Sequence, residues 1–300
     1  MTTSSSAALR FCPTTSASSS SRSFAGHTLI LPTISSGSVP QLCVDLLVAH
    51  RPLSLSRVGS LDAGQDLIPF VGGSDGEAGI STALDVFSSS HGVTVVQQRS
   101  PVLRARRAGF ARRMAAWARE EGFARVVVLS SLDAALRGDE ELGSSGGMMH
   151  YMLDADGQEQ KKLAKVLQLA GPAVSSNLLV GQGEAGGLST SSPPQSRLPS
   201  SSAGLTSRYL SALSGPDSGS SSSPAIPSGA LLLWAAEGDN RGDAHRMAHC
   251  VVDEVLPGLG SMGRAGPDAA QGSQEGKQEL EEPQSWRGLY GNAYDQALFG

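Results

Sequence analysis

Arg125-Val-Val-Val-Leu-Ser130 is an uninterrupted apolar and β-branched run. A run of this kind suits a strand that is buried on both faces of a mostly parallel sheet. The segment before it, Arg106–Glu121, has the periodicity of an amphipathic helix, with Phe110, Met114 and Trp117 on one apolar stripe. A helix followed by a doubly buried strand indicates an α/β fold.

The same alternation of strands and helices continues on both sides of this run. On the C-terminal side, the apolar run Ala230–Ala235 is followed by a helical pattern over Asp243–Leu256. On the N-terminal side, a strand over Thr28–Leu31 is followed by a helix over Val39–His50. We therefore expect a three-layer αβα sandwich around a mostly parallel sheet. The remaining expected strands are Val58–Leu61, Leu67–Val71, Leu84–Phe87, Val93–Gln97 and Ser175–Val180, and the remaining expected helices are Leu163–Leu169 and Leu205–Leu213.

Composition predicts one domain with several loop insertions. Only 39% of the 300 residues are apolar, and Ser, Gly and Pro are concentrated in a few stretches. We expect flexible surface insertions near residues 181–202, 214–228 and 257–278 within a single domain spanning 24–300. Residues 1–23 are rich in Ser and Thr and contain two arginines but no acid, so they are either a disordered extension or a transit peptide.

Charge and cysteine content narrow the class of function. The formal net charge of -5 argues against general nucleic-acid binding, which requires a basic domain. No apolar run approaches the roughly 18 residues needed to span a membrane. The three cysteines, Cys12, Cys43 and Cys250, are far apart and form no C-x-x-C motif, so we expect neither a disulfide framework nor a zinc site, and a reducing compartment fits.

Two glycine-rich motifs look like catalytic or cofactor sites. Gly181–Gly186 matches G-x-G-x-x-G, but the Ser- and Pro-rich residues after it cannot begin the helix that a dinucleotide site needs. Gly143–Gly147 matches G-x-S-x-G, but Asp139–Leu142 is not the buried strand that a nucleophile elbow needs. We interpret both as loops, and we expect no cofactor.

Two groups of polar residues have both a functional and a structural interpretation. His245 and His249 have zinc-ligand spacing, with Cys250 next to them, but Arg246 stands where a metalloprotease motif has glutamate; solvated or partly packed histidines are the simpler interpretation. The arginines between Arg99 and Arg125 form either the solvated face of a helix or a contact for an acidic protein surface.

Glu237-Gly-Asp-Asn240 follows the carboxyl end of an expected strand, where α/β folds place their ligand sites. The alternative is a turn in which Asp239, Asn240 or Asp243 caps the next helix. Residue types alone favour the turn.

Several segments, in shared order and spacing, resemble one family, the proteasome assembly chaperone 2 proteins. Outside the insertions the resemblance covers most of the chain, and the Glu-Gly-Asp-Asn and Ser-Trp-Arg segments are its most specific parts. The resemblance is poor between Asp154 and Ala203. The segments are Phe24–Val39, Gln41-Leu42, Asp45-Leu46, Arg57–Gly59, Leu67–Gly72, Trp117, Ala124–Ser131, His150–Leu153, Gly204-Leu-Thr206, Ala236–Asn240, with Glu237, Gly238 and Asp239 inside it, Pro283–Arg287, with Ser285 and Trp286 inside it, and Ala297–Phe299.

The resemblance implies a protein that binds other proteins and performs no catalysis. Members pair with a second chaperone, proteasome assembly chaperone 1, and the heterodimer holds proteasome α-type subunits during formation of the 20S α-ring. It further implies a nucleoside-phosphorylase-like core without that active site, and a location in the cytoplasm and nucleus. The alternative is a nucleoside-phosphorylase-like or hydrolase-like enzyme, which would need convergent polar groups near Glu237, Asp239, Ser130 and Ser131. An organelle is the alternative location if residues 1–23 are a transit peptide.

The C-terminal residues Leu298-Phe-Gly300 resemble the hydrophobic–tyrosine–any tail that related chaperones insert between α-type subunits. Phe299 departs from that pattern, because it lacks the tyrosine hydroxyl. The alternative is that Trp286, Leu289, Tyr290 and Phe299 pack the C-terminus onto the domain.

Overall fold

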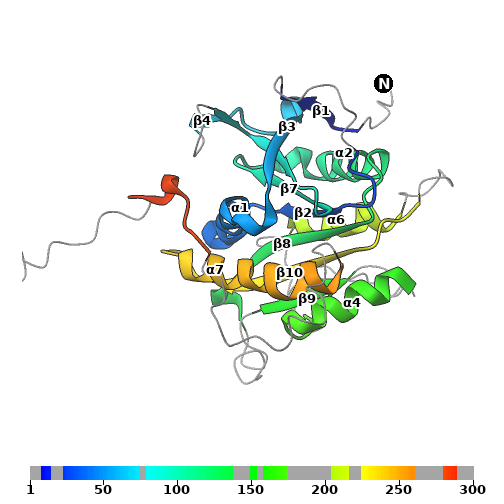
Figure 1. Cartoon of the computed structure of the whole chain (residues 1–300), viewed down its shortest axis with the longest axis vertical. Coiled ribbons are helices and arrows are strands. Elements are labelled where there is room, and N and C mark those ends of the chain that lie inside the picture. Colours follow the sequence, from blue (N-terminus) through cyan, green and yellow to red (C-terminus); the bar gives the residue numbers. More distant parts are fainter. Residues whose placement is uncertain are drawn as a thin grey trace, which may run out of the picture.

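The computed structural model describes residues 8–14, 23–73, 79–137, 149–153, 158–174, 204–215, 224–260 and 280–288. These residues form an eight-stranded sheet in the order β1-β3-β6-β7-β2-β8-β10-β9 (Figure 1). A separate pair consists of β4 (Val71–Gly73) and β5 (Ile80–Thr82). The strands of the large sheet are β1 (Arg10–Pro13), β2 (Thr28–Pro32), β3 (Ser56–Asp62), β6 (Leu84–Ser88), β7 (Val93–Gln98), β8 (Arg125–Asp133), β9 (Met149–Leu153) and β10 (Ser228–Ala235).

The centre of the sheet is parallel. Strand β2 pairs in parallel with β7 and β8, and β8 pairs in parallel with β10. The outer pairs, β1–β3, β3–β6, β6–β7 and β10–β9, are antiparallel. Strand β3 therefore points in the same direction as the central four, and β1, β6 and β9 point the opposite way. The expected mostly parallel sheet is confirmed, with its parallel pairs in the middle.

Helices cover both faces of this sheet, which confirms the three-layer prediction. One face packs against α2 (Arg107–Glu120) and α6 (Gly204–Ser214). The other packs against α1 (Val39–Ala49), α4 (Gln158–Ala170) and α7 (Arg241–Cys250). Strand β8 serves both cores, because successive side chains of a strand point to opposite faces: Val126 and Val128 belong to the first core, and Val127 and Leu129 to the second.

Helix α2 carries the expected apolar stripe, since Phe110, Met114 and Trp117 are all buried. Its arginines are less solvated than the pattern indicates. The Arg119 guanidinium donates to the carbonyls of Ala212 and Leu213 at the end of α6. These carbonyls belong to the last turn of the helix, where intrahelical donors are missing. Part of the basic stretch is therefore structural.

Some elements differ from the sequence-based expectation. The strand expected over Leu67–Val71 is wrong: Leu67 forms only an isolated bridge with Val102, and β4 begins at Val71. Pro69 lies between them and has no N–H for a ladder. The helix expected over Asp243–Leu256 begins at Arg241 and includes a π-helical turn, η6 (Val251–Val255), before α8 (Leu256–Gly258).

Three of the described strands were not expected at all: β1, β5 and β9. Strand β1 lies within residues 1–23, where a disordered or targeting extension was expected. Leu9 is buried in the core, and Arg10–Pro13 pair with β3. An extension therefore does not describe residues 8–14.

The expected insertions overlap partly with described residues. Near 214–228, Ser214 belongs to α6 and Ser228 to β10, Ile226 is buried, and its N–H donates to the Leu213 carbonyl. Near 257–278, the Leu259 carbonyl accepts a hydrogen bond from Arg125. Both ends of the first stretch and the start of the second thus belong to the domain. The insertion near 181–202, the strand expected over 175–180 and the motifs at 143–147 and 181–186 lie outside the described residues.

The three thiols are free, and burial raises the pKa of Cys43 well above its usual value and that of Cys250 to about 12. Among the helices of the described ranges, none is long and apolar enough to cross a membrane.

Candidate functional site

Buried hydroxyl groups join the carboxyl ends of β2 and β8 to helix α6. Thr33, just after β2, donates to the Ser130 hydroxyl over 2.9 Å, and Thr206 of α6 donates to the same oxygen over 2.9 Å. All three residues are buried. Because a buried hydroxyl without a partner costs free energy, this network fixes α6 against the sheet. It gives Thr206 of the Gly-Leu-Thr segment a structural role, while Gly204 begins the helix beside Arg107.

Ser131 fixes the loop between β2 and α1. Its backbone N–H donates to the Ser35 hydroxyl over 2.9 Å, and its own hydroxyl donates to the Ser36 carbonyl. An enzyme at this edge would have needed Ser130 and Ser131 for chemistry. In the structure, both hydroxyls hold neighbouring elements in place.

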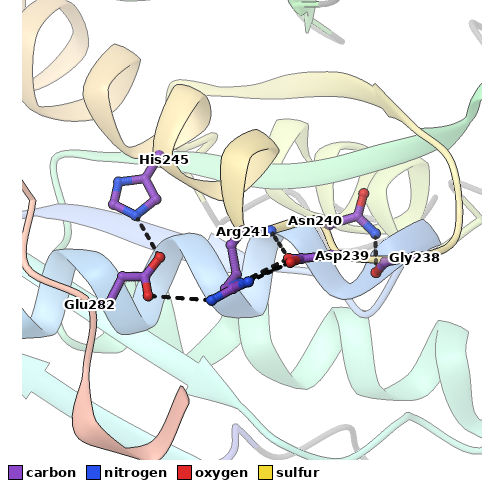
Figure 2. Close-up of polar contacts among 6 residues, drawn as sticks. All are labelled: Gly238, Asp239, Asn240, Arg241, His245 and Glu282. Atoms are coloured by element: carbon purple, nitrogen blue, oxygen red, sulfur yellow. Dashed lines mark hydrogen bonds and ion pairs between the residues drawn. The ribbon is translucent and has the colours of Figure 1, made fainter. Parts of the chain in front are cut away.

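The loop after β10 carries Glu237-Gly-Asp-Asn240. Figure 2 shows Gly238, Asp239 and Asn240 of this loop. Asp239 accepts hydrogen bonds from the Arg241 guanidinium at 2.6 and 2.9 Å and from the Arg241 backbone N–H at 3.1 Å. Hydrogen bonds from Arg241 lower the pKa of the Asp239 carboxyl, and the bond from the side chain contributes more than the bond from the backbone N–H. The loop therefore leads into α7 as the turn alternative expects, but the N-cap residue, Asn240, makes no capping hydrogen bond with its side chain. Glu237 is exposed.

Asn240 points back into the domain. Its side-chain amide donates to the Gly238 carbonyl over 3.0 Å, and only 3% of the residue is exposed. Gly37, in the β2–α1 loop, lies directly against it: a Cβ added to Gly37 would be 2.4 Å from Nδ2 of Asn240. Gly37 also has a positive φ of 66°. The two loops therefore pack against each other through a glycine that leaves room for the amide.

The C-terminal segment, residues 280–288, lies across α1 and α7. Glu282 contacts both Arg241 (3.7 Å) and His245 (3.3 Å) of α7, as Figure 2 shows. Trp286 is buried, and its indole N–H donates to Asp45 of α1 over 3.3 Å. Trp286 thus anchors this segment to the domain. For Trp286, this agrees with the alternative in which the C-terminus packs onto the domain.

Asp45 is the centre of a polar cluster that was not predicted from the sequence. The Arg99 guanidinium binds both of its oxygens, at 2.6 and 2.9 Å, and the Gln97 amide donates to one of them over 2.6 Å. The side chain of Asp45 is only 9% exposed. The sequence held two signals of this cluster. Asp45 is a carboxylate inside the apolar helix expected over Val39–His50, and Arg99 lies at the end of an expected strand. The two residues are 54 positions apart in the chain, so no local pattern links them.

The remaining predicted site residues are not brought together. His245 contacts Glu282, whereas His249 contacts Asp253, and within the described ranges no group of three or more metal-ligating side chains occurs. Ser285 is exposed. The tail residues Leu298, Phe299 and Gly300 lie outside the described residues.

A protein-family model described as PAC2 family matches residues 29–236. The chain belongs to the PAC2 family. The match begins in β2 and ends just after β10, so it contains the hydroxyl network and Asp45 but not the C-terminal segment.

Individual relatives agree with this assignment. Proteasome assembly chaperone 2 of Danio rerio is 28% identical over 284 residues, which cover 92% of this chain and 96% of that protein. The Nematostella vectensis protein of the same name is 34% identical over 144 residues, or 45% of this chain and 57% of that protein. Among solved structures, Pyrococcus furiosus PbaA, described as an archaeal homolog of proteasome-assembly chaperone, has a TM-score of 0.51 at 10% identity, covering 84% of this chain and 86% of that one. At that identity the likeness concerns the fold alone.

Proposed function

We propose that this PAC2 family protein is a proteasome assembly chaperone that acts by binding other proteins. In this proposal it pairs with a second chaperone of the proteasome assembly chaperone 1 type and holds α-type subunits while the 20S α-ring forms. The observation that carries the proposal is the similarity to the Danio rerio chaperone over nearly the whole length of both chains.

The geometry supports a binding role rather than a catalytic one. The hydroxyls of Ser130 and Ser131 are hydrogen-bonded between structural elements, and the Asp239 carboxylate is paired with Arg241. These are the groups that a phosphorylase-like or hydrolase-like site at this edge would have used. We propose no cofactor.

The test of this function is reconstitution with the second chaperone and the α-type subunits of the same organism. Co-expression of the two chaperones is expected to give a one-to-one complex, and the complex is expected to increase the yield of α-rings over off-pathway assemblies. Analytical ultracentrifugation and native electrophoresis measure both results. A chain that stays monomeric in the presence of the second chaperone and leaves α-ring yield unchanged would contradict the proposal.

The C-terminal tail is proposed as one of the contacts with the α-ring. Trp286 anchors the chain to the domain, and twelve residues, 289–300, follow Gly288. Leu298 and Phe299 can bury apolar area in a pocket between subunits. Removing Leu298–Gly300 is expected to weaken binding of assembled α-rings about tenfold, which corresponds to about 1.4 kcal/mol.

Pairing with the second chaperone is the internal control for this truncation. It is expected to survive, because Trp286 and the described segment remain in place. Surface plasmon resonance on immobilised α-rings measures the first quantity, and size-exclusion chromatography the second. Unchanged ring affinity, or loss of the folded domain, would favour packing of the tail on the domain.

The location is proposed to be the cytoplasm and the nucleus. Strand β1 pairs with β3, and Leu9 is buried in the core. Cleavage of a transit peptide at residue 23 would remove both, so residues 8–14 are better explained as part of the domain. Mass spectrometry of the mature N-terminus tests this.

A further inference from the structure

The β4–β5 hairpin and the segments beside it expose several large apolar side chains, which together we call the hairpin surface. Its most exposed members are Val71 (74%) and Ile80 (61%). Exposed apolar surface of this kind often marks a site of interaction with another protein. The hairpin surface consists of Ile68, Phe70, Val71, Ile80 and Leu103.

This surface is held in a defined position. The Ser100 hydroxyl donates to the Ile68 carbonyl over 2.6 Å, and the Leu103 N–H donates to the Asp66 carbonyl over 2.9 Å. Val71 faces Thr82 in the antiparallel pair β4–β5. The backbone that carries these apolar side chains is therefore already hydrogen-bonded, so binding a partner would not require this backbone to become ordered.

Unpaired cations border the hairpin surface. Arg104 directly follows Leu103, and Arg106 lies two residues further on. Both are exposed, and within the described part of the chain neither makes an ion pair or hydrogen bond through its side chain. Their neighbours differ: Arg99 is bound to Asp45 and Arg113 to Asp66. A matching partner therefore carries apolar side chains edged by carboxylates, since opposite charges around an apolar centre favour specific docking.

The hairpin surface and the C-terminal segment lie on the same side of the molecule in Figure 1, where β4 is at the upper left and the red C-terminal residues are at the left. A chain of contacts connects them: Trp286 donates to Asp45, Asp45 binds Arg99, and the next residue, Ser100, holds Ile68. A partner that binds the residues after Gly288 is therefore placed to meet the hairpin surface too.

We infer that the hairpin surface, with Arg104 and Arg106, is a second docking contact for the partner of the C-terminal tail. This inference rests on the proposed function, in which that partner is the proteasome α-ring. The contact is made with an apolar, acid-edged patch of an α-type subunit. The tail anchors the chain, and the hairpin surface sets the orientation of the domain on the ring.

The test uses the full chain in complex with the second chaperone, and α-rings as the probe. The variant V71S/I80S is expected to weaken ring binding about tenfold by removing apolar area at two exposed positions. The control L136S/L169S removes two exposed leucines elsewhere, 47% and 65% exposed, and is expected to leave binding unchanged. Thermal melting checks that each variant is folded.

A second experiment reverses the charge of the two arginines beside the hairpin surface and provides independent evidence. The variant R104E/R106E is expected to weaken ring binding severalfold and to reduce its salt dependence. The matched control K161E/K165E changes two exposed lysines of α4 and is expected to behave like the wild type.

The outcomes separate this inference from the proposed function. If the wild-type complex binds no α-ring, the proposed function is wrong and the inference is wrong with it. If the wild type binds and both hairpin variants bind equally well, the inference alone is overturned. If the hairpin variants lose the second chaperone but the chain remains folded, the surface is the pairing interface and the inference is again overturned.

Discussion

Replacing Asp45 by alanine is expected to lower the free energy of unfolding by about 3 kcal/mol. The carboxylate accepts hydrogen bonds from Arg99, Gln97 and Trp286, and its side chain is only 9% exposed. Alanine leaves these donors without their acceptor in a site that water reaches poorly, and the cost of such unpaired groups exceeds the net gain from forming the bonds. Urea denaturation followed by circular dichroism measures the loss.

The same substitution is expected to loosen the C-terminal segment, because the Trp286 indole loses its acceptor. Limited trypsin digestion at the exposed Arg287 is therefore expected to be faster than in the wild type. Asp62→Ala is the matched control, because it breaks the ion pair between Asp62 and Arg10. The Asp62 side chain is 44% exposed and that of Arg10 is 76% exposed, so a much smaller effect on stability is expected. Equal losses for the two variants would show that burial of Asp45 adds nothing.

Replacing Gly37 by alanine is expected to destabilise the protein by about 2–4 kcal/mol. The positive φ of 66° accounts for roughly 1–2 kcal/mol, because a Cβ is strained in the left-handed region. The remainder arises because that Cβ would be 2.4 Å from the buried amide of Asn240, which would have to move. Gly92→Ala is the control, since Gly92 has a similar φ of 75° and no atom within 4 Å of an added Cβ.

A double-mutant cycle isolates the contact between the two loops. Asn240→Ala removes the amide atoms that an added Cβ would meet. Gly37→Ala in that background is expected to cost no more than Gly92→Ala, so the two substitutions should be strongly non-additive. Thermal or urea unfolding of the four proteins measures this. Additive losses would mean that Gly37 is needed for its backbone conformation alone.

The architecture was accessible from the sequence because it depends on local patterns. The buried run at Arg125–Ser130 and the stripe of Phe110, Met114 and Trp117 predict a doubly covered strand and an amphipathic helix, and both occur in the structure. Helix α1 begins at Val39 and β10 ends at Ala235, as expected. The resemblance to one family also came from the sequence, and the family model confirms it.

Where sequence reasoning failed, the outcome depends on contacts between distant parts of the chain. The apolar run Leu67–Val71 has the composition of a core strand, yet in the described part of the chain β4 begins only at Val71 and pairs with the short strand β5. Residues 8–14 have the composition of an extension, yet β3 offers them a free edge to pair with.

By itself, the sequence determined the α/β class, the order of its main elements and the family, because periodicity and residue type act over a few neighbouring residues. Only the tertiary structure decided what the polar groups do. Ser130 meets Thr206, Gly37 meets Asn240, and Asp45 meets Trp286 only after the chain has folded. Such partners are selected by the packing of whole elements, and the low dielectric between those elements makes a buried polar group without a partner costly.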